Sequence, residues 1–168
     1  LLRRIRRYRL LSKNIFVVGI KIDTRSGEFI KTHDNQHLQL HIVNNLKDIF
    51  ETIEYKNSEI VVFDEAQFFP DVVDSVKKML SDNKTILCCG LSGTFQQTPF
   101  ENISQLISMA TEITFLKAIC THKISENEIC GNDAPFTSKF DSHSNSIIET
   151  GGLELYAPRC QKHFSYYC

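Results

Sequence analysis

The sequence predicts an α/β fold, in which helices cover a parallel sheet and a small domain of different composition follows. Short apolar segments alternate with amphipathic ones through residues 1–119, which is the pattern of strands and crossover helices. The short segments are apolar at nearly every position, as expected for a sheet covered on both faces. From Cys120 onward, cysteines, glycines and the polar run "TSKFDSHSNS" replace this pattern. We therefore expect an α/β domain at 1–119 and a small domain at 120–168.

The first half of the chain predicts two helices and two strands. Leu1–Leu11 is apolar at i, i+4, i+7 and i+10, so one helix face is apolar, and five arginines occupy much of the rest. Asn14–Ile20 is a short apolar run rich in β-branched residues, which favours a strand. Apolar residues return at helical spacing over Ile42–Ile53, and Glu59–Phe63 is the next predicted strand.

The following segments repeat this alternation. The apolar positions of Val72–Leu80 predict a helix, and Asp71 near its start suits the helix dipole. Thr85–Leu91 reads as a strand, Ile103–Ala110 as a helix and Glu112–Ile119 as a further strand.

Composition and charge exclude several classes of protein. The 168 residues are 42% hydrophobic and 23% charged, as in ordinary globular proteins, and the formal net charge of -1 favours neither nucleic acid nor an anionic membrane. No apolar run approaches the roughly 18 residues of a membrane-spanning helix. Six cysteines could form disulfides in a secreted protein. Because Cys88 and Cys89 lie in an apolar run and the others come late, a reducing cytoplasm fits better.

Two adjacent carboxylates end one of the predicted strands. In "IVVFDEAQFF", an apolar run leads directly into Asp64 and Glu65. Isolated buried carboxylates are costly, and α/β sheets bind ligands beyond the carboxyl ends of their strands. The pattern resembles a Walker B motif, in which the aspartate supports Mg²⁺ on nucleotide phosphates and the glutamate can act as a general base. The alternative is a strand end whose acids only face water.

The same letters suggest a second class of protein. "DEAQ" also resembles motif II of RNA helicases, which would make the chain a fragment of a helicase-type ATPase. A helicase core needs a much longer chain, and no Ser-Ala-Thr motif follows this strand. The arginines of the first helix are better explained as a solvated face, because the net charge is close to zero.

Five stretches in one order point to a known family. They are "KIDTR" (Lys21–Arg25), "THD" (Thr32–Asp34), "DEAQFFPD" (Asp64–Asp71), "GLSGTFQQTPF" (Gly90–Phe100) and "GGLELYAPRCQKH" (Gly151–His163). Over essentially the whole chain they resemble the type II thymidine kinases, the cellular and poxviral type. The resemblance implies a P-loop-type sheet flanked by helices, with a small C-terminal zinc-ribbon and lasso domain. It also implies an ATP-dependent nucleoside kinase of the cytoplasm that phosphorylates the 5′-hydroxyl of thymidine and forms a homotetramer.

The resemblance assigns catalytic and ATP-binding roles. Glu65 would be the catalytic base and Asp64 the Mg²⁺ carboxylate, while Arg25 would stabilise charge on the transferring phosphate with Asp23 holding it in place. The expected ATP and Mg²⁺ set is Asp23, Thr24, Arg25, Asp64 and Gln67.

The resemblance also assigns a nucleoside pocket, with a lasso loop at 137–156 that reads thymine largely through backbone groups. Gly151 and Gly152 would permit a tight turn and a close backbone approach. Without the resemblance, the phenylalanines involved would be assigned to the core. The expected walls are Phe68, Leu91, Phe95 and Phe100, and the expected loop residues are Thr137, Ile147, Ile148, Glu149, Thr150, Gly151 and Tyr156.

The family holds its small domain with a structural Zn²⁺ bound by two Cys-x-x-Cys pairs. Here the second pair reads Cys160 and His163, which zinc accepts. An insertion of about seven residues, "HKISENE", would separate Cys120 from Cys130 in the first pair. His122 is the alternative second ligand, and ordinary buried thiols without zinc are the other reading.

Two departures from the family pattern remain. Ser92 stands where an acidic residue is frequent, and a modest local hydrogen-bond change is expected. No G-x-x-x-x-G-K-S/T phosphate loop occurs in the sequence. In the family this loop directly precedes the helix that "LLRRIRRYRL" matches, so we expect the chain as printed to lack the loop and to bind ATP poorly. A catalytically inactive relative that binds nucleotides is the alternative.

Overall fold

The computed structural model describes residues 1–21, 29–31, 37–140 and 155–164. The chain forms two compact units. The first unit consists of residues 1–91 and 101–106, and the second of residues 92–100 and 107–168. Within the described residues, no helix is both long and apolar enough to cross a membrane.

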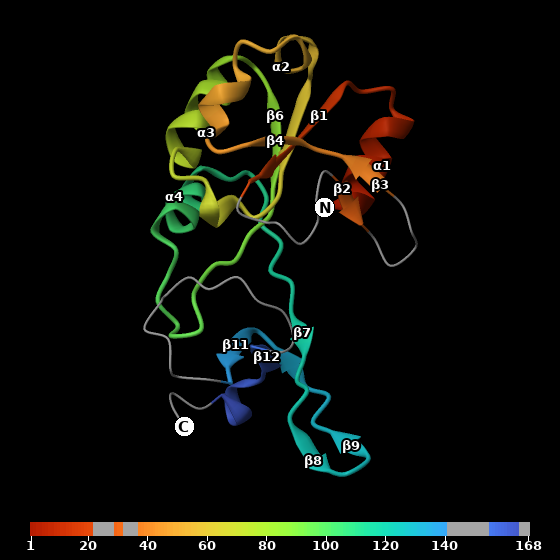
Figure 1. Ribbon diagram of the computed structural model, residues 1–168, viewed down its shortest axis with the longest axis vertical. Coiled ribbons are helices and arrows are strands. Elements are labelled where there is room, and N and C mark those ends of the chain that lie inside the picture. The colour runs from red at the N-terminus through yellow and green to blue at the C-terminus, as the bar shows by residue number, and fades with distance from the viewer. Residues whose placement is uncertain (22–28, 32–36, 141–154, 165–168) are drawn as a thin grey trace. The chain divides into compact units, whose positions relative to one another are not determined.

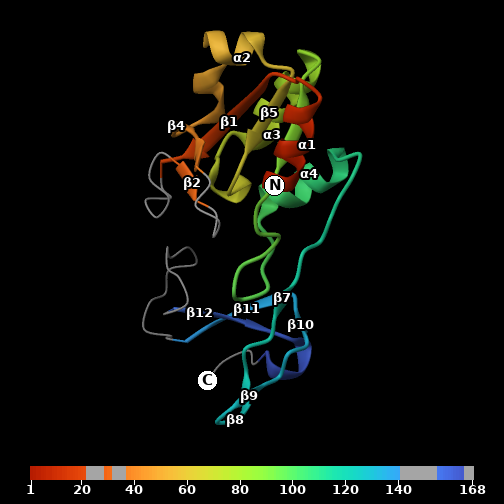
Figure 2. The ribbon, with the colours of Figure 1, turned by 90° about the vertical axis from the view of Figure 1, so that its right-hand side faces the viewer.

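A parallel four-stranded sheet forms the centre of the first unit (Figure 1). Its strands are β1 (Ile15–Ile20), β4 (His41–Val43), β5 (Ile60–Phe63) and β6 (Thr85–Cys88), in the order β4-β1-β5-β6. Figure 2 shows β1 and β5 running side by side. Every residue of β5 is buried, which confirms the expectation of an α/β fold with a doubly covered sheet.

The strand order creates a switch point between β1 and β5. From β1 the chain adds β4 on one side, and it then returns to add β5 and β6 on the other side. Ligands of open α/β sheets bind beyond the carboxyl ends of the strands at such a point. The residues that directly follow β5, Asp64 and Glu65, therefore lie where a ligand is expected.

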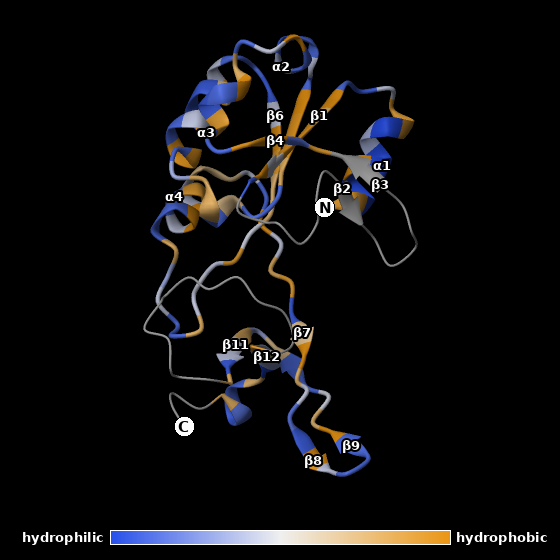
Figure 3. Ribbon diagram, in the orientation of Figure 1, coloured by the Kyte–Doolittle hydropathy of each residue, from blue (hydrophilic) through white to orange (hydrophobic). Residues whose placement is uncertain are grey.

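Three of the predicted helices are confirmed: α1 (Leu2–Leu10), α3 (Val72–Ser81) and α4 (Glu101–Met109). Figure 1 shows α1 and α3 on opposite sides of the sheet. Ile5 of α1 is 1% exposed and packs with Val17 of β1. In Figure 3, β1 is hydrophobic along its length, whereas α1 and α3 mix hydrophobic and hydrophilic residues. The helices thus cover the sheet with one face each.

The helix predicted over Ile42–Ile53 is wrong. The structure has strand β4, a 3-10 turn (Leu46–Ile49) and the short helix α2 (Ile53–Asn57) in this part of the chain. The Asp71 carboxylate explains the break, because it accepts the backbone N–H groups of Leu46 (3.0 Å) and Lys47 (2.8 Å). The helical spacing arises because the turn buries Leu46 and Ile49 fully.

The strand predicted over Glu112–Ile119 is also wrong. Only β7 (Ala118–Ile119) is a strand, and it pairs antiparallel with β10 (Asp133–Ala134) in the second unit. Phe115 and Leu116 are 69% and 84% exposed, so this apolar run does not join the described central sheet.

Short antiparallel pairs make up the rest of the described strands. In the second unit, β8 (Lys123–Ser125) pairs with β9 (Glu128–Ile129), and β11 (Phe136–Lys139) pairs with β12 (Tyr156–Arg159). In the first unit, β2 (Phe29–Lys31) pairs with β3 (His37–Gln39). The second unit therefore has no described sheet of more than two strands.

Candidate active site and metal centre

The predicted carboxylates lie at the end of β5, beside the end of β6. Phe63 and Cys88 are register partners in these two parallel strands. The next residues, Asp64 and Cys89, consequently leave the sheet as neighbours. The backbone N–H of Ala66 donates to the carbonyl of Cys89 at 2.9 Å, which ties the two segments together beyond the sheet.

The backbone of Glu65 is held in an uncommon conformation. Its φ and ψ of 53° and 45° lie in the left-handed region, which costs a residue other than glycine about 1–3 kcal/mol. Its N–H donates to Oδ1 of Asp64 at 2.9 Å, and the Gln67 side chain donates Nε2 to Oε2 of Glu65 at 2.6 Å. Such strain clusters at functional sites, because there the surroundings fix one geometry.

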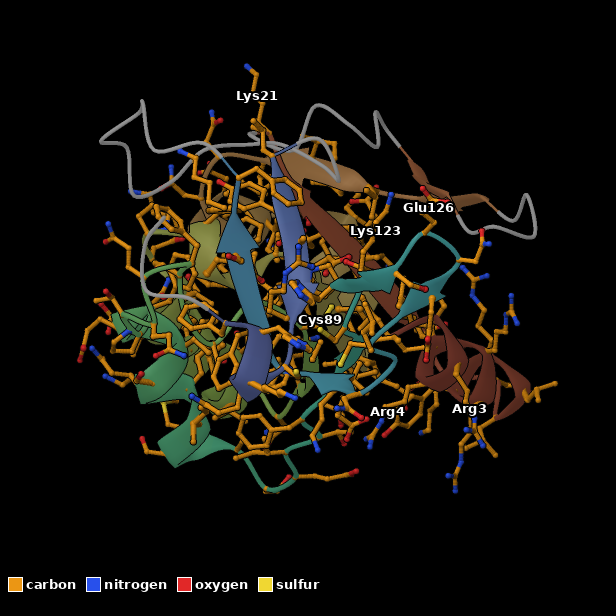
Figure 4. All side chains as sticks on the ribbon, turned by 90° about the horizontal axis from the view of Figure 1, so that it is seen from below. Arg3, Arg4, Lys21, Cys89, Lys123 and Glu126 are labelled. Atoms are coloured by element: carbon orange, nitrogen blue, oxygen red, sulfur yellow. The ribbon has the colours of Figure 1, made fainter. Side chains whose placement is uncertain are left out.

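The Asp64 carboxylate also accepts a hydrogen bond from a cysteine. Sγ of Cys89 donates to Oδ1 of Asp64 at 2.6 Å, and Figure 4 labels Cys89. Burial, followed by the charge of Asp64, raises the pKa of the Cys89 thiol far above its usual range. The thiol therefore keeps its proton and acts as a donor to the carboxylate.

Two of the expected nucleoside walls lie in the first unit. Phe68 is half-buried in the 3-10 turn Ala66–Phe68, and Leu91 is 51% exposed. The backbone N–H of Leu91 donates to Oε1 of Gln67 at 3.1 Å, so the segment after β6 is joined to the turn after β5.

The second unit brings together other expected pocket residues. The rings of Phe95 and Tyr156 are 6.4 Å apart, and Nζ of Lys139 lies 5.3 Å from the Phe95 ring centroid. Phe95 lies in a closed loop, in which the N–H of Thr94 donates to the carbonyl of Thr98 at 2.8 Å. Two further expected residues have defined positions: Phe100 precedes α4, and Thr137 pairs with Pro158.

The remaining expected site residues lie outside the described part of the chain. They are Asp23, Thr24, Arg25, Ile147, Ile148, Glu149, Thr150 and Gly151.

Four side chains with zinc-binding atoms converge in the second unit. The ligand atoms of Cys120, Cys130, Cys160 and His163 all lie within 4.8 Å of one another. Sγ of Cys130 is 3.8 Å from Sγ of Cys160, and Nδ1 of His163 is 3.4 Å from the same sulfur. Sulfur ligands 2.3 Å from a tetrahedral Zn²⁺ are separated by about 3.8 Å. Three thiols and an imidazole at these separations fit a closed zinc site.

Backbone hydrogen bonds close the chain around these ligands in two places. The N–H of Gly131 donates to the carbonyl of Cys120 at 3.1 Å, and φ of Gly131 is +70°, which favours glycine. The N–H of His163 donates to the carbonyl of Cys160 at 3.0 Å. Burial acts to raise the pKa of the Cys120 thiol, but hydrogen bonds from the backbone of Cys160 and His122 and from His163 lower it to about 6. Such a thiol is readily available as thiolate.

His122, the alternative ligand, does not belong to this cluster of ligand atoms. Its ring stacks on the His163 ring with centroids 4.0 Å apart. The residues after it form the hairpin of β8 and β9, which carries Lys123 and Glu126 (Figure 4).

Sequence reasoning missed Cys89, Gly90 and Asn102 as parts of the candidate active site. Asn102 Nδ2 donates to the carbonyls of Gln67 (3.0 Å) and Phe69 (3.4 Å). Asn102 is one of several polar residues of this helix, so the sequence offers no distinct signal for it, and its partner lies 35 residues away.

Comparison with known proteins identifies the family. The family model described as thymidine kinase matches residues 1–164. The chain is 33% identical over 166 residues to thymidine kinase 1 of Dictyostelium discoideum, covering 96% of this chain and 69% of that protein. It is 32% identical over 162 residues to the thymidine kinase of Myxoma virus (strain Uriarra), covering 96% and 85%. The Variola virus thymidine kinase is 30% identical over 162 residues, covering 96% and 86%. From its sequence, its fold and these matches, the chain belongs to the thymidine kinase family.

Proposed function

We propose that this protein is an ATP-dependent thymidine kinase, which transfers the γ-phosphate of ATP to the 5′-hydroxyl of thymidine. The observation that carries the proposal is the pair Asp64 and Glu65 at the switch point of the sheet, in a chain of this family. The helicase-type alternative is not favoured, because the thymidine kinase model covers nearly the whole chain.

Glu65 is the proposed general base. Phosphoryl transfer depends mainly on positioning and on charge stabilisation, so the protein needs to hold the hydroxyl and accept its proton. A half-buried carboxylate whose Oε2 accepts a hydrogen bond from Gln67 is suited to this role.

Asp64 is the proposed carboxylate for Mg²⁺. Magnesium prefers oxygen ligands and binds through one or two carboxylates together with substrate phosphates. When bound, the ion neutralises charge on the phosphates. The proposed set of residues that bind ATP and Mg²⁺ also includes Asp23, Thr24, Arg25 and Gln67.

The proposed nucleoside pocket combines apolar walls with loop backbone. A planar base requires apolar or aromatic faces and a few polar contacts. Within the second unit, the proximity of Phe95 to Tyr156 supports this assignment. The full proposed set is Phe68, Leu91, Phe95, Phe100, Thr137, Ile147, Ile148, Glu149, Thr150, Gly151 and Tyr156.

The proposed zinc is structural. A tetrahedral Zn²⁺ takes four ligands, and four protein ligand atoms would leave no position for a substrate. The proposed ligands are Cys120, Cys130, Cys160 and His163. We further propose a cytoplasmic location, since the free cysteines of the described residues suit a reducing compartment. The homotetramer is proposed from the resemblance to the family alone.

The test compares thymidine phosphorylation by the parent protein and by Glu65→Gln. Both are made as the polypeptide that the complete reading frame encodes, and labelled thymidine, ATP and Mg²⁺ are supplied. We expect the parent to form thymidine monophosphate and Glu65→Gln to lose about 10²–10⁴ in turnover while still binding thymidine.

Glu54→Gln is the matched control, because Glu54 is an exposed residue of α2. It should retain parent turnover. A parent protein that binds thymidine without phosphorylating it would support a catalytically inactive relative. Parent turnover in Glu65→Gln would remove Glu65 from the role of base.

A further inference from the structure

Gln67 joins the two segments that leave the sheet at the candidate active site. It is only 6% exposed. Its Nε2 donates to Oε2 of Glu65 at 2.6 Å, while its Oε1 accepts the backbone N–H of Leu91 at 3.1 Å. One side-chain amide therefore links the proposed base to the start of the chain segment that follows β6.

The partners fix which way the amide points. An ionised carboxylate can only accept hydrogen bonds, and a backbone N–H can only donate. Nε2 must therefore face Glu65, and Oε1 must face Leu91. The reversed orientation would place oxygen against oxygen at Glu65 and nitrogen against N–H at Leu91.

The surroundings leave the amide little freedom to move. A Cβ added at Gly90 would stand 2.5 Å from Oε1 of Gln67 and 3.1 Å from the backbone nitrogen of Ala66. The absence of a side chain at Gly90 is thus what lets the amide reach Leu91. On the backbone side, Asn102 of α4 donates to the carbonyl of Gln67 at 3.0 Å.

We propose that Gln67 is a positioning residue for phosphoryl transfer, and not only a member of the ATP-binding set. Its amide holds the Glu65 carboxylate, whose own backbone is strained, in the orientation in which it accepts the proton. It also ties this orientation to Leu91, an expected wall of the nucleoside pocket. The inference rests on the proposed function, because it assigns Glu65 the role of base.

The distinguishing property of this role is that it acts through Glu65. A residue that only stabilises the fold changes stability, and its effect on turnover is independent of Glu65. A positioning residue loses its effect once the carboxylate is gone, so the two substitutions are strongly non-additive.

The experiment measures kcat and KM for Gln67→Leu, Gln67→Glu, Glu65→Gln and the double variant Glu65→Gln/Gln67→Leu, in the polypeptide of the complete reading frame. We expect Gln67→Leu to lower kcat about 10²-fold with little change in the KM for thymidine, as for a misplaced catalytic group. Gln67→Glu keeps an acceptor for Leu91 but sets a carboxylate against Glu65, so its kcat should fall at least as far. The double variant should be no slower than Glu65→Gln alone.

Gln105→Leu is the matched control, since it makes the same exchange at an exposed position of α4. It should retain the parent kcat. A second readout does not need activity: hydrogen exchange of the Leu91 amide should be faster in Gln67→Leu than in the parent or in Gln67→Glu.

The outcomes separate the two proposals. An active parent whose kcat survives in Gln67→Leu, or whose losses add in the double variant, would overturn the positioning role alone. A parent that forms no thymidine monophosphate overturns the proposed function and the catalytic role of Gln67 together. In that case an unchanged Leu91 exchange rate in Gln67→Leu would also refute the amide bridge.

Discussion

Cys89 orients the carboxylate of Asp64, the residue that we propose for Mg²⁺. Its protonated thiol donates to one oxygen of Asp64, and that oxygen also accepts the N–H of Glu65. Two donors on one oxygen leave the other oxygen of Asp64 as the better ligand for a cation. The orientation of the carboxylate is thus set before any ligand arrives.

Removal of this donor should weaken the response to Mg²⁺. A hydrogen bond to a charged group contributes about 1.5–3 kcal/mol, so Cys89→Ala should raise the Mg²⁺ concentration for half-maximal activity at least about tenfold. Cys89→Ser keeps a donor at the same place and should recover most of the response. Cys88→Ala, a substitution at the exposed neighbouring thiol, is the control. The measurement is initial rate against Mg²⁺ concentration at saturating ATP, and identical curves for Cys89→Ala and the parent would contradict the assignment.

The candidate site residues that could be predicted from the sequence depend on neighbours along the chain, whereas those that could not be predicted depend on distant partners. Asp64 and Glu65 could be predicted because the apolar run that positions them directly precedes them. The contact of Cys89 with Asp64 spans 25 residues and exists only because β5 and β6 are neighbours. Strand order is not encoded in local periodicity, so such contacts need the fold.

At the scale of elements, a prediction was correct where the spacing of apolar residues matched the face that the element buries. The strands β1 and β5 are apolar throughout, and α3 has one apolar face, so their types follow from local pattern. The segment Ile42–Ile53 has helical spacing too, but the distant Asp71 carboxylate takes two of its backbone N–H groups and breaks it. A local pattern cannot reveal a competing long-range acceptor.

The contact between α2 and the end of α3 gives a pH-dependent prediction. A hydrogen bond from Lys78 lowers the pKa of Asp82 most, and a hydrogen bond from the hydroxyl of the buried Tyr55 (2.6 Å) lowers it further. A folded-state pKa below the unfolded value of about 3.9 means that this carboxylate stabilises the fold above that pH, and that the contribution is lost as pH falls through the folded pKa.

We therefore expect Asp82→Asn to lower the urea midpoint at neutral pH, with the difference from the parent shrinking below about pH 4. Asp74→Asn is the control on the same helix, because Asp74 is 91% exposed and its ion pair with Lys77 at 3.5 Å should contribute little. Unfolding curves at several pH values test this. A difference that is constant down to pH 2 would show that Asp82 does not act through its charge.

At the scale of the whole molecule, the two units differ in the interactions that stabilise each of them internally. The first unit has a buried sheet with helices on both sides. In the second unit, the described strands are two to four residues long. Among its described residues, one buried cluster consists of Cys120, Cys160 and Ala134, with Cys130 against it, and Ala157 and Phe164 are buried as well. A cluster made mostly of the candidate zinc ligands contributes little against the entropy of ordering the chain around it, and small units of this kind depend on metal.

Zinc removal should accordingly unfold the second unit. We expect one Zn²⁺ per chain by elemental analysis. A chelator should abolish the hydrogen-exchange protection of the Cys120 and Gly131 amides, which donate to the carbonyls of Asn132 and Cys120 beside the candidate ligands. Cys160→Ala should have the same effect without a chelator, whereas Cys88→Ala should keep the metal. Amides of β1 and β5 provide the internal reference, because apolar packing and strand pairing hold these strands. Protection of Cys120 and Gly131 that survives complete loss of zinc would mean that thiol packing alone folds this unit, and the four converging ligands would then need another explanation.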